Sequence, residues 1–136
     1  MTTTAAAADT RRYTGIYPAD PAQVRHARAA LAELLRGCSR ADDAILIASE
    51  FATNSVLYSA SRGGGEFTLR AEVRQDDIRI EVEDAGGPWH GGPHDDSRPH
   101  GFEVVAAIAG SQNWGMDGDT RGRTAWARLG RCVRGA

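Results

Sequence analysis

The sequence contains no lysine, and all sixteen of its basic residues are arginine. Eighteen acidic residues leave a formal net charge of −2. That balance argues against a protein that coats nucleic acid, because such a protein needs a basic stripe that releases counterions from the phosphates. Arginine still allows forked contacts to individual phosphate groups, which lysine does not offer.

Cysteine and long apolar runs are also scarce. Cys38 and Cys132 stand far apart and match neither a disulfide framework nor a zinc-ligand spacing, so we expect both to be reduced. No run approaches the ~20 apolar residues of a membrane span. Residues 1–9 are rich in threonine and alanine and lack the cationic and apolar segments of a secretion signal. The sequence therefore predicts a cytoplasmic protein without membrane association.

The length of 136 residues fits one domain without repeats. At this size roughly two-thirds of the unfolded surface can be buried without help from disulfides or metal. We expect a flexible N-terminal tail over residues 1–10, one domain over 11–130 and a C-terminal tail over 131–136.

Two helices are predicted in the first half of the chain. Asp20 followed by Pro21 is a helix start, and the helix is expected to run to about Arg36, before Gly37. Its apolar residues recur at the spacing of a one-sided amphipathic helix, at Val24, Ala27, Leu31, Leu34 and Leu35.

The second predicted helix is apolar on nearly all sides. Ser39 with Asp42 resembles a capping box, and the helix is expected to continue to about Ser59. Its run over residues 44–57 is typical of a helix covered on several sides. Such a helix has little room for polar side chains.

Glu50 and Asn54 interrupt that apolar surface. They are four residues apart and so lie on one face of the helix. An unpaired buried carboxylate is costly, so we expect the pair to border a polar cavity. An ion pair of Glu50 with an arginine, and a loop cap by Asn54, are equally compatible with these two residues alone.

A hairpin is predicted next, since apolar and polar residues alternate over 67–73 and again over 78–82, around a turn at 75–77. The same alternation places Asp84 on the inward face. Asp84 precedes Ala85-Gly86-Gly87, and glycine lets a backbone approach a ligand closely. An inward carboxylate there could accept a hydrogen bond from an amine such as that of adenine, although a turn-forming aspartate before glycine is common.

The last third begins with an aperiodic loop over 85–100, a length typical of lids and binding loops. We expect a helix over 101–109, a strand over 112–116, a turn over 117–119 and a last strand over 123–129. Thr124 and Trp126 share one face of that strand while Ala125, Ala127 and Leu129 share the other, so the buried face stays open, and we favour the core for Trp126. Gly101 at the helix start offers free N–H groups to an anion.

Four short segments together resemble the motifs of the GHKL ATPases. They are the N-box at Glu50–Val56, the D-x-G box at Asp84–Gly87, the end of the G-x-G box at His100–Phe102 and the final G-x-T at Gly122–Thr124. Among these ATPases, the short chain most resembles the anti-sigma-factor serine kinases of Gram-positive bacteria. The resemblance implies the Bergerat fold, an α+β two-layer sandwich with a mixed, mostly antiparallel sheet covered on one face by about three helices.

The resemblance also implies roles for individual residues. Asn54 would bind the Mg²⁺ that bridges the phosphates of ATP, and Asp84 would accept a hydrogen bond from the adenine amine. Glu50 would be the general base that activates a serine or threonine hydroxyl of a partner protein.

Further cofactor-binding residues are implied around the lid. Gly86 and Gly101 would let the backbone close around the nucleotide, next to Phe102 in the same box. Thr124 would help to seat the adenine. Arg98 is a candidate cation for the γ-phosphate, with a solvated loop arginine as the alternative.

The implied partners are a sigma factor and an antagonist protein, with a possible homodimer. Pro99 replaces the first glycine of the G-x-G box, which removes an N–H and fixes φ. That departure favours an alternative in which the domain only sequesters a partner, with weak or no use of ATP.

A third interpretation is a metal site in the loop. Its candidate ligands are His90, His94, Asp95, Asp96 and His100. Their spacing matches no standard metal-binding pattern, so this interpretation ranks below the other two.

Overall fold

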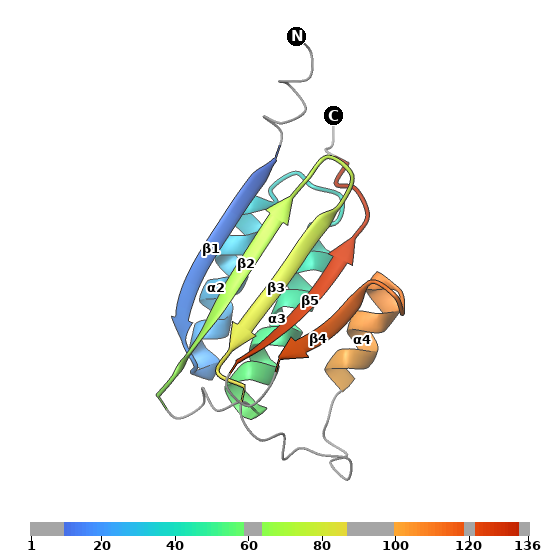
Figure 1. Ribbon diagram of the computed structural model, residues 1–136. Helices are drawn as coiled ribbons and strands as arrows, with labels where there is room; N and C mark the ends of the chain where they lie inside the picture. The colour runs from blue at the N-terminus through green and yellow to red at the C-terminus, as the bar shows by residue number, and fades with distance from the viewer. Residues whose placement is uncertain (1–9, 59–63, 87–99, 119–121, 134–136) are drawn as a thin grey trace.

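The computed structural model describes residues 10–58, 64–86, 100–118 and 122–133. Five strands form one sheet, and three helices pack on one of its faces (Figure 1). The elements in chain order are β1 (Arg11–Pro18), α2 (Pro21–Leu34), α3 (Ala41–Tyr58), β2 (Glu66–Val73), β3 (Ile78–Asp84), α4 (His100–Ala109), β4 (Trp114–Gly118) and β5 (Arg123–Leu129). This arrangement confirms the two-layer α+β sandwich.

The strand order is β1-β2-β3-β5-β4. All four pairings between the described strands are antiparallel, so the sheet is more uniform than the mixed arrangement expected. The β2–β3 hairpin closes where the Arg74 N–H donates to the Asp77 carbonyl at 2.9 Å. The hairpin thus forms around the predicted turn.

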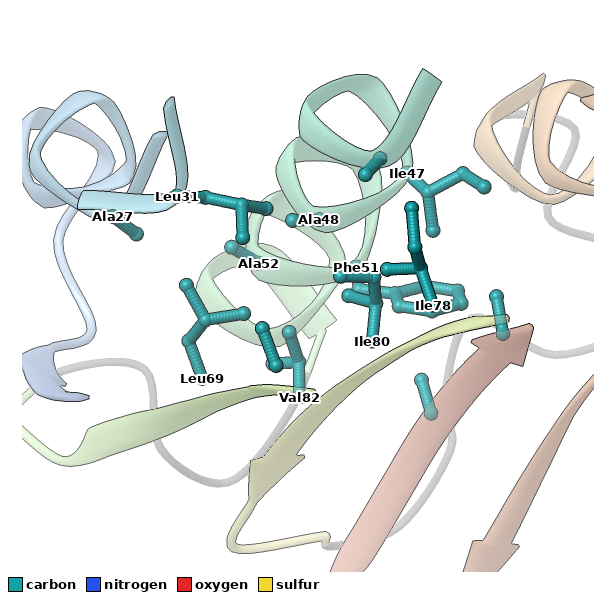
Figure 2. Close-up of a cluster of buried hydrophobic side chains, with 14 of the residues drawn as sticks. Ala27, Leu31, Ile47, Ala48, Phe51, Ala52, Leu69, Ile78, Ile80 and Val82 are labelled. Atoms are coloured by element: carbon teal, nitrogen blue, oxygen red, sulfur yellow. The ribbon is translucent and has the colours of Figure 1, made fainter. Parts of the chain in front are cut away.

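The core lies between the sheet and α3. Every second residue of β2 and β3 is buried, as the alternation predicts. Phe51 and Ile47 of α3 meet Ile78 and Ile80 of β3, and all four side chains are at most 1% exposed (Figure 2). The close packing of these large side chains fixes α3 against β3, which positions the polar residues of both elements.

Helix α3 is covered by α2 and α4 as well as by the sheet (Figure 1). This coverage explains its nearly uniform apolar surface. Leu46 and Leu57 are exceptions, with exposures of 41% and 44%. None of the helices in the described part of the chain is long and apolar enough to cross a membrane.

Helix α2 begins as predicted. The Asp20 carboxylate caps it by accepting from the Ala22 N–H at 2.8 Å, with Pro21 in the first turn. The helix ends at Leu34, two residues earlier than expected, and Gly37 follows with a φ of 81°. The left-handed conformation at Gly37 suits glycine and reverses the chain toward α3.

The expected reduced state of Cys38 and Cys132 is wrong, because the structure joins them in a disulfide with Cα atoms 5.3 Å apart. Ser39 lies beside the same C-terminal segment. Its hydroxyl accepts from the Val133 N–H at 3.0 Å, and its own N–H donates to the Val133 carbonyl at 2.9 Å. In place of the predicted capping box, Ser39 bonds to Val133. These bonds and the disulfide fasten the segment after β5 to the start of α3.

Strand β4 begins and ends about two residues later than predicted. Asp117 and Gly118, expected in a turn, pair with Thr124 and Arg123 of β5. The cross-strand pairing extends the strand over residues that look turn-forming in sequence.

Trp126 is not in the helix-covered core. Ala125, Ala127 and Leu129 of β5 are buried, so the alternation turns Trp126 to the open face of the sheet. The Arg79 guanidinium lies 4.9 Å from the centre of its ring system. Trp126 therefore packs against the Arg79 cation on the open face and not, as was expected, against the core.

Candidate functional site

Helix α3 supplies three polar side chains near its C-terminal end. Glu50 is half-buried, Asn54 is 7% exposed and Ser55 is 2% exposed. Glu50 and Asn54 are one helical turn apart, as predicted. Among the described residues, no hydrogen bond joins the Asn54 amide to another side chain.

Asp84 ends β3 on the same side of the sheet, and its side chain is only 3% exposed. The inward position predicted by alternation is confirmed. Its carboxylate accepts three hydrogen bonds: Ser55 Oγ donates to Oδ2 at 2.6 Å, Arg123 Nη2 donates to Oδ2 at 2.9 Å and the Gly86 N–H donates to Oδ1 at 2.8 Å. A charged group is thus held in place by one contact each from α3, β5 and the start of the loop.

Gly86 has a φ of 72°, in the left-handed region that favours glycine. This conformation turns its N–H back toward the Asp84 carboxylate two residues earlier. The glycine expected at the nucleotide therefore has a defined task, which is to fold the chain over Asp84.

Arg123 is the site residue that the sequence analysis missed. It pairs directly with Asp84 in the β3–β5 register, and its side chain is 9% exposed. The alternation of Ala125, Ala127 and Leu129 already places Arg123 on the inner face, and this signal could have revealed it. The resemblance directed attention to the neighbouring threonine instead.

Thr124 lies on the opposite face of the sheet from Asp84. Its partner in the register is Glu83, whose side chain points to the open face. The structure thus pairs Arg123, and not Thr124, with Asp84, while the role of Thr124 in seating adenine stays a prediction.

The Asp84–Arg123 pair is buried, so its energetics differ from those of a surface ion pair. Taking two charges out of water is costly, and their attraction repays that cost only with good geometry and further hydrogen bonds. Ser55 and Gly86 supply such bonds to the carboxylate. Removing one partner would leave an uncompensated buried charge.

Most of the loop that the sequence predicts as a lid lies outside the described residues. Arg98 and Pro99 lie outside the described residues, as do the candidate metal ligands His90, His94, Asp95 and Asp96. Within the described ranges, no group of three or more histidine, cysteine, aspartate or glutamate side chains could hold a metal ion.

Helix α4 begins at the end of the sheet where β3 ends (Figure 1). Gly101 lies in its first turn, where backbone N–H groups suit an anion. Phe102 is half-buried and contacts the Trp114 ring, with centroids 5.5 Å apart. Phe102 therefore fastens the first turn of α4 to β4.

A cavity of about 390 Å³ lies at the other end of the sheet, beside the β2–β3 hairpin. Asp77 in its wall is held by Arg74 Nε at 2.7 Å. Because this cavity is remote from Asn54 and Asp84, we assign it no part in the candidate site.

The donors of the site fit a magnesium nucleotide. Mg²⁺ prefers oxygen ligands and usually keeps several waters beside one or two protein groups and the phosphates. The buried Asn54 amide offers one such oxygen, while the Asp84 carboxylate retains an acceptor position for a base amine. Fold and site together define a nucleotide-binding domain.

Residues 17–123 match the family model of the histidine kinase-like ATPase domain. The match covers most of the chain, and the chain belongs to this family. A search of curated proteins finds no match.

Proposed function

We propose that this protein binds Mg²⁺–ATP and acts as an anti-sigma-factor-type regulator with serine/threonine kinase activity on an antagonist protein. The observation that supports the proposal is the hydrogen bond from Ser55, which follows the buried Asn54 on α3, to Asp84 at the end of β3. A cytoplasmic location is part of the proposal, since ATP and sigma factors act there.

In this proposal Asn54 holds Mg²⁺ and Asp84 accepts the adenine amine. Glu50, one turn before Asn54, takes the proton from the partner's hydroxyl as that oxygen attacks the γ-phosphate. The N–H groups at the start of α4, around Gly101, face the negative charge of the phosphates. Mg²⁺, when bound, neutralises charge on the phosphates.

Nucleotide binding is the first test. Titration of Mg²⁺–ATP into wild type and Asp84→Asn by calorimetry should show an affinity at least about tenfold lower in the variant, because a carboxylate acceptor is lost. Asp77→Asn, in the remote hairpin, is the matched control and should bind as wild type does. Undiminished affinity in Asp84→Asn would refute the adenine role.

Phosphate transfer is the second test. The protein is incubated with Mg²⁺ and γ-labelled ATP together with candidate antagonist proteins, and the label on their serine or threonine residues is counted. Glu50→Gln should lower transfer by about 100-fold or more, as expected for a lost general base. Glu33→Gln, on the exposed face of α2, should leave transfer unchanged.

The alternative is a non-catalytic domain that sequesters a sigma factor or another partner. Pro99, which precedes α4, is the observation that favours it, because proline offers no N–H to a phosphate. Binding of ATP without transfer would support this alternative, and the absence of any nucleotide binding would refute the kinase.

A further inference from the structure

The hydrogen-bonding capacity of Asp84 is unevenly used. An ionised carboxylate has about two acceptor positions on each oxygen. Within the described part of the chain, Oδ2 accepts from both Ser55 Oγ and Arg123 Nη2, whereas Oδ1 accepts from the Gly86 N–H alone. With respect to these described donors, Oδ2 is saturated and one position on Oδ1 is open.

We propose that Arg123, together with Ser55, sets the base specificity of the nucleotide site by occupying Oδ2 of Asp84. The carboxylate then accepts a single N–H from a nucleobase, at Oδ1. This inference rests on the proposed function, because it concerns the same site.

The number of available acceptors discriminates between the two purines. Adenine presents one exocyclic amine beside a ring nitrogen that accepts, so one carboxylate oxygen satisfies it. Guanine presents two adjacent donors, a ring N–H and an amine, which match both oxygens of a carboxylate. With Oδ2 occupied, one guanine donor stays without a partner, and an unpaired polar group in a desolvated site lowers affinity.

Burial keeps this arrangement in place. The side chains of Arg123 and Asp84 are 9% and 3% exposed, and Ser55 is 2% exposed. Water therefore has little access to compete for Oδ2, and the three groups come from separate elements that the core holds together. A base cannot displace the guanidinium without leaving a charge buried and unpaired.

Calorimetric titration with Mg²⁺–ADP and Mg²⁺–GDP tests the proposal in wild type, Ser55→Ala and Arg123→Met. Wild type should bind ADP at least about tenfold more tightly than GDP. Each variant should lower that ratio by about threefold to tenfold, since an acceptor position on Oδ2 becomes available for the second guanine donor. The ratio is informative because a general loss of structure weakens both nucleotides.

Two matched controls remove the same chemical groups elsewhere. The controls are Ser49→Ala and Arg128→Met. Ser49 lies on α3 beside the groove with α2, and Arg128 lies on the exposed side of β5. Both should keep the wild-type ratio.

The possible failures are distinct. If wild type binds neither nucleotide, both the proposed function and this inference are refuted. If wild type binds ADP and GDP equally, or if Ser55→Ala keeps the wild-type ratio, nucleotide binding stands and the inference is overturned. Ser55→Ala decides the matter if Arg123→Met does not fold, because it leaves the ion pair intact.

Discussion

Arginine pairs with carboxylates on both faces of the sheet, in two contrasting ways. On the helix-covered face, Arg123 and Asp84 are almost fully buried. On the open face, Arg70 bridges Glu81 at 3.2 Å and Glu83 at 2.6 Å, with side chains 24% to 47% exposed. The distances are similar, so what separates the Asp84–Arg123 pair from the pairs of Arg70 is their exposure to water.

Dielectric screening explains the contrast. Exposed ion pairs contribute about 0–1 kcal/mol because water and salt screen them and long side chains lose entropy. A buried pair cannot lose one partner without leaving an unscreened charge.

The largest expected effect is that of Arg123→Met on stability. The change leaves Asp84 charged and buried, which should lower the free energy of unfolding by about 3–5 kcal/mol in urea denaturation. Arg123→Met combined with Asp84→Asn should recover a large part of the loss, because both charges are then gone. If Arg123→Met alone were as stable as wild type, solvent would have to screen the Asp84 charge despite its burial, and the prediction would fail.

A smaller loss of stability is expected from Cys132→Ser, which removes the disulfide between the C-terminal segment and the start of α3. Loss of a disulfide should cost about 2–4 kcal/mol in thermal or urea unfolding under oxidising conditions. With a thiol reductant present, wild type and variant should unfold alike. The variant should keep the ADP-to-GDP affinity ratio, and a changed ratio would show that instability alone alters specificity.

On the open face, Arg70→Met should cost less than about 1 kcal/mol of unfolding free energy. Raising the salt concentration from about 0.1 M to 1 M should shrink even that difference, because the Debye length falls from about 10 Å to 3 Å. The loss in Arg123→Met should respond far less to salt. Equal salt dependence of the two variants would contradict the comparison between the two faces.

The smallest expected effect concerns pH. Burial raises the pKa of Glu81, but hydrogen bonds from Arg79 and Arg70 outweigh it and hold the pKa below its ordinary value of 4.5. A lowered pKa in the folded state gives stability that is present above the unfolded-state pKa and is lost as the pH falls through the folded-state value. The difference in unfolding midpoint between wild type and Glu81→Gln should therefore disappear when the pH falls below the folded-state pKa of Glu81. Thermal unfolding at several pH values would test this.

Much of the site was predictable from local pattern. Alternation along β3 placed Asp84 inward, and helical spacing placed Glu50 and Asn54 on one face of α3. In β5 the alternation left both faces open, and the burial of Ala125, Ala127 and Leu129 shows that Trp126 faces outward. Its aromatic character favoured the core, and period-two geometry decided otherwise.

Other features depend on which segments meet. The register of β3 with β5 sets Arg123, and not Thr124, opposite Asp84. The closing of the sheet brings Cys132 to Cys38, although 94 residues separate them in the chain. No local pattern encodes such distances, because they result from the packing of whole elements.

Local pattern was sufficient to predict the inward side chains of β2, β3 and α3, because backbone geometry has fixed periods of about 2 in strands and 3.6 in helices. That was enough to predict a polar pocket at Asn54 and Asp84. The meeting of α3, β3 and β5 then brought the Ser55 hydroxyl and the Arg123 guanidinium to the Asp84 carboxylate, which no single element reveals. The physical reason is that register and helix placement follow from the packing of the shared core, and that packing selects the donors that reach a buried carboxylate.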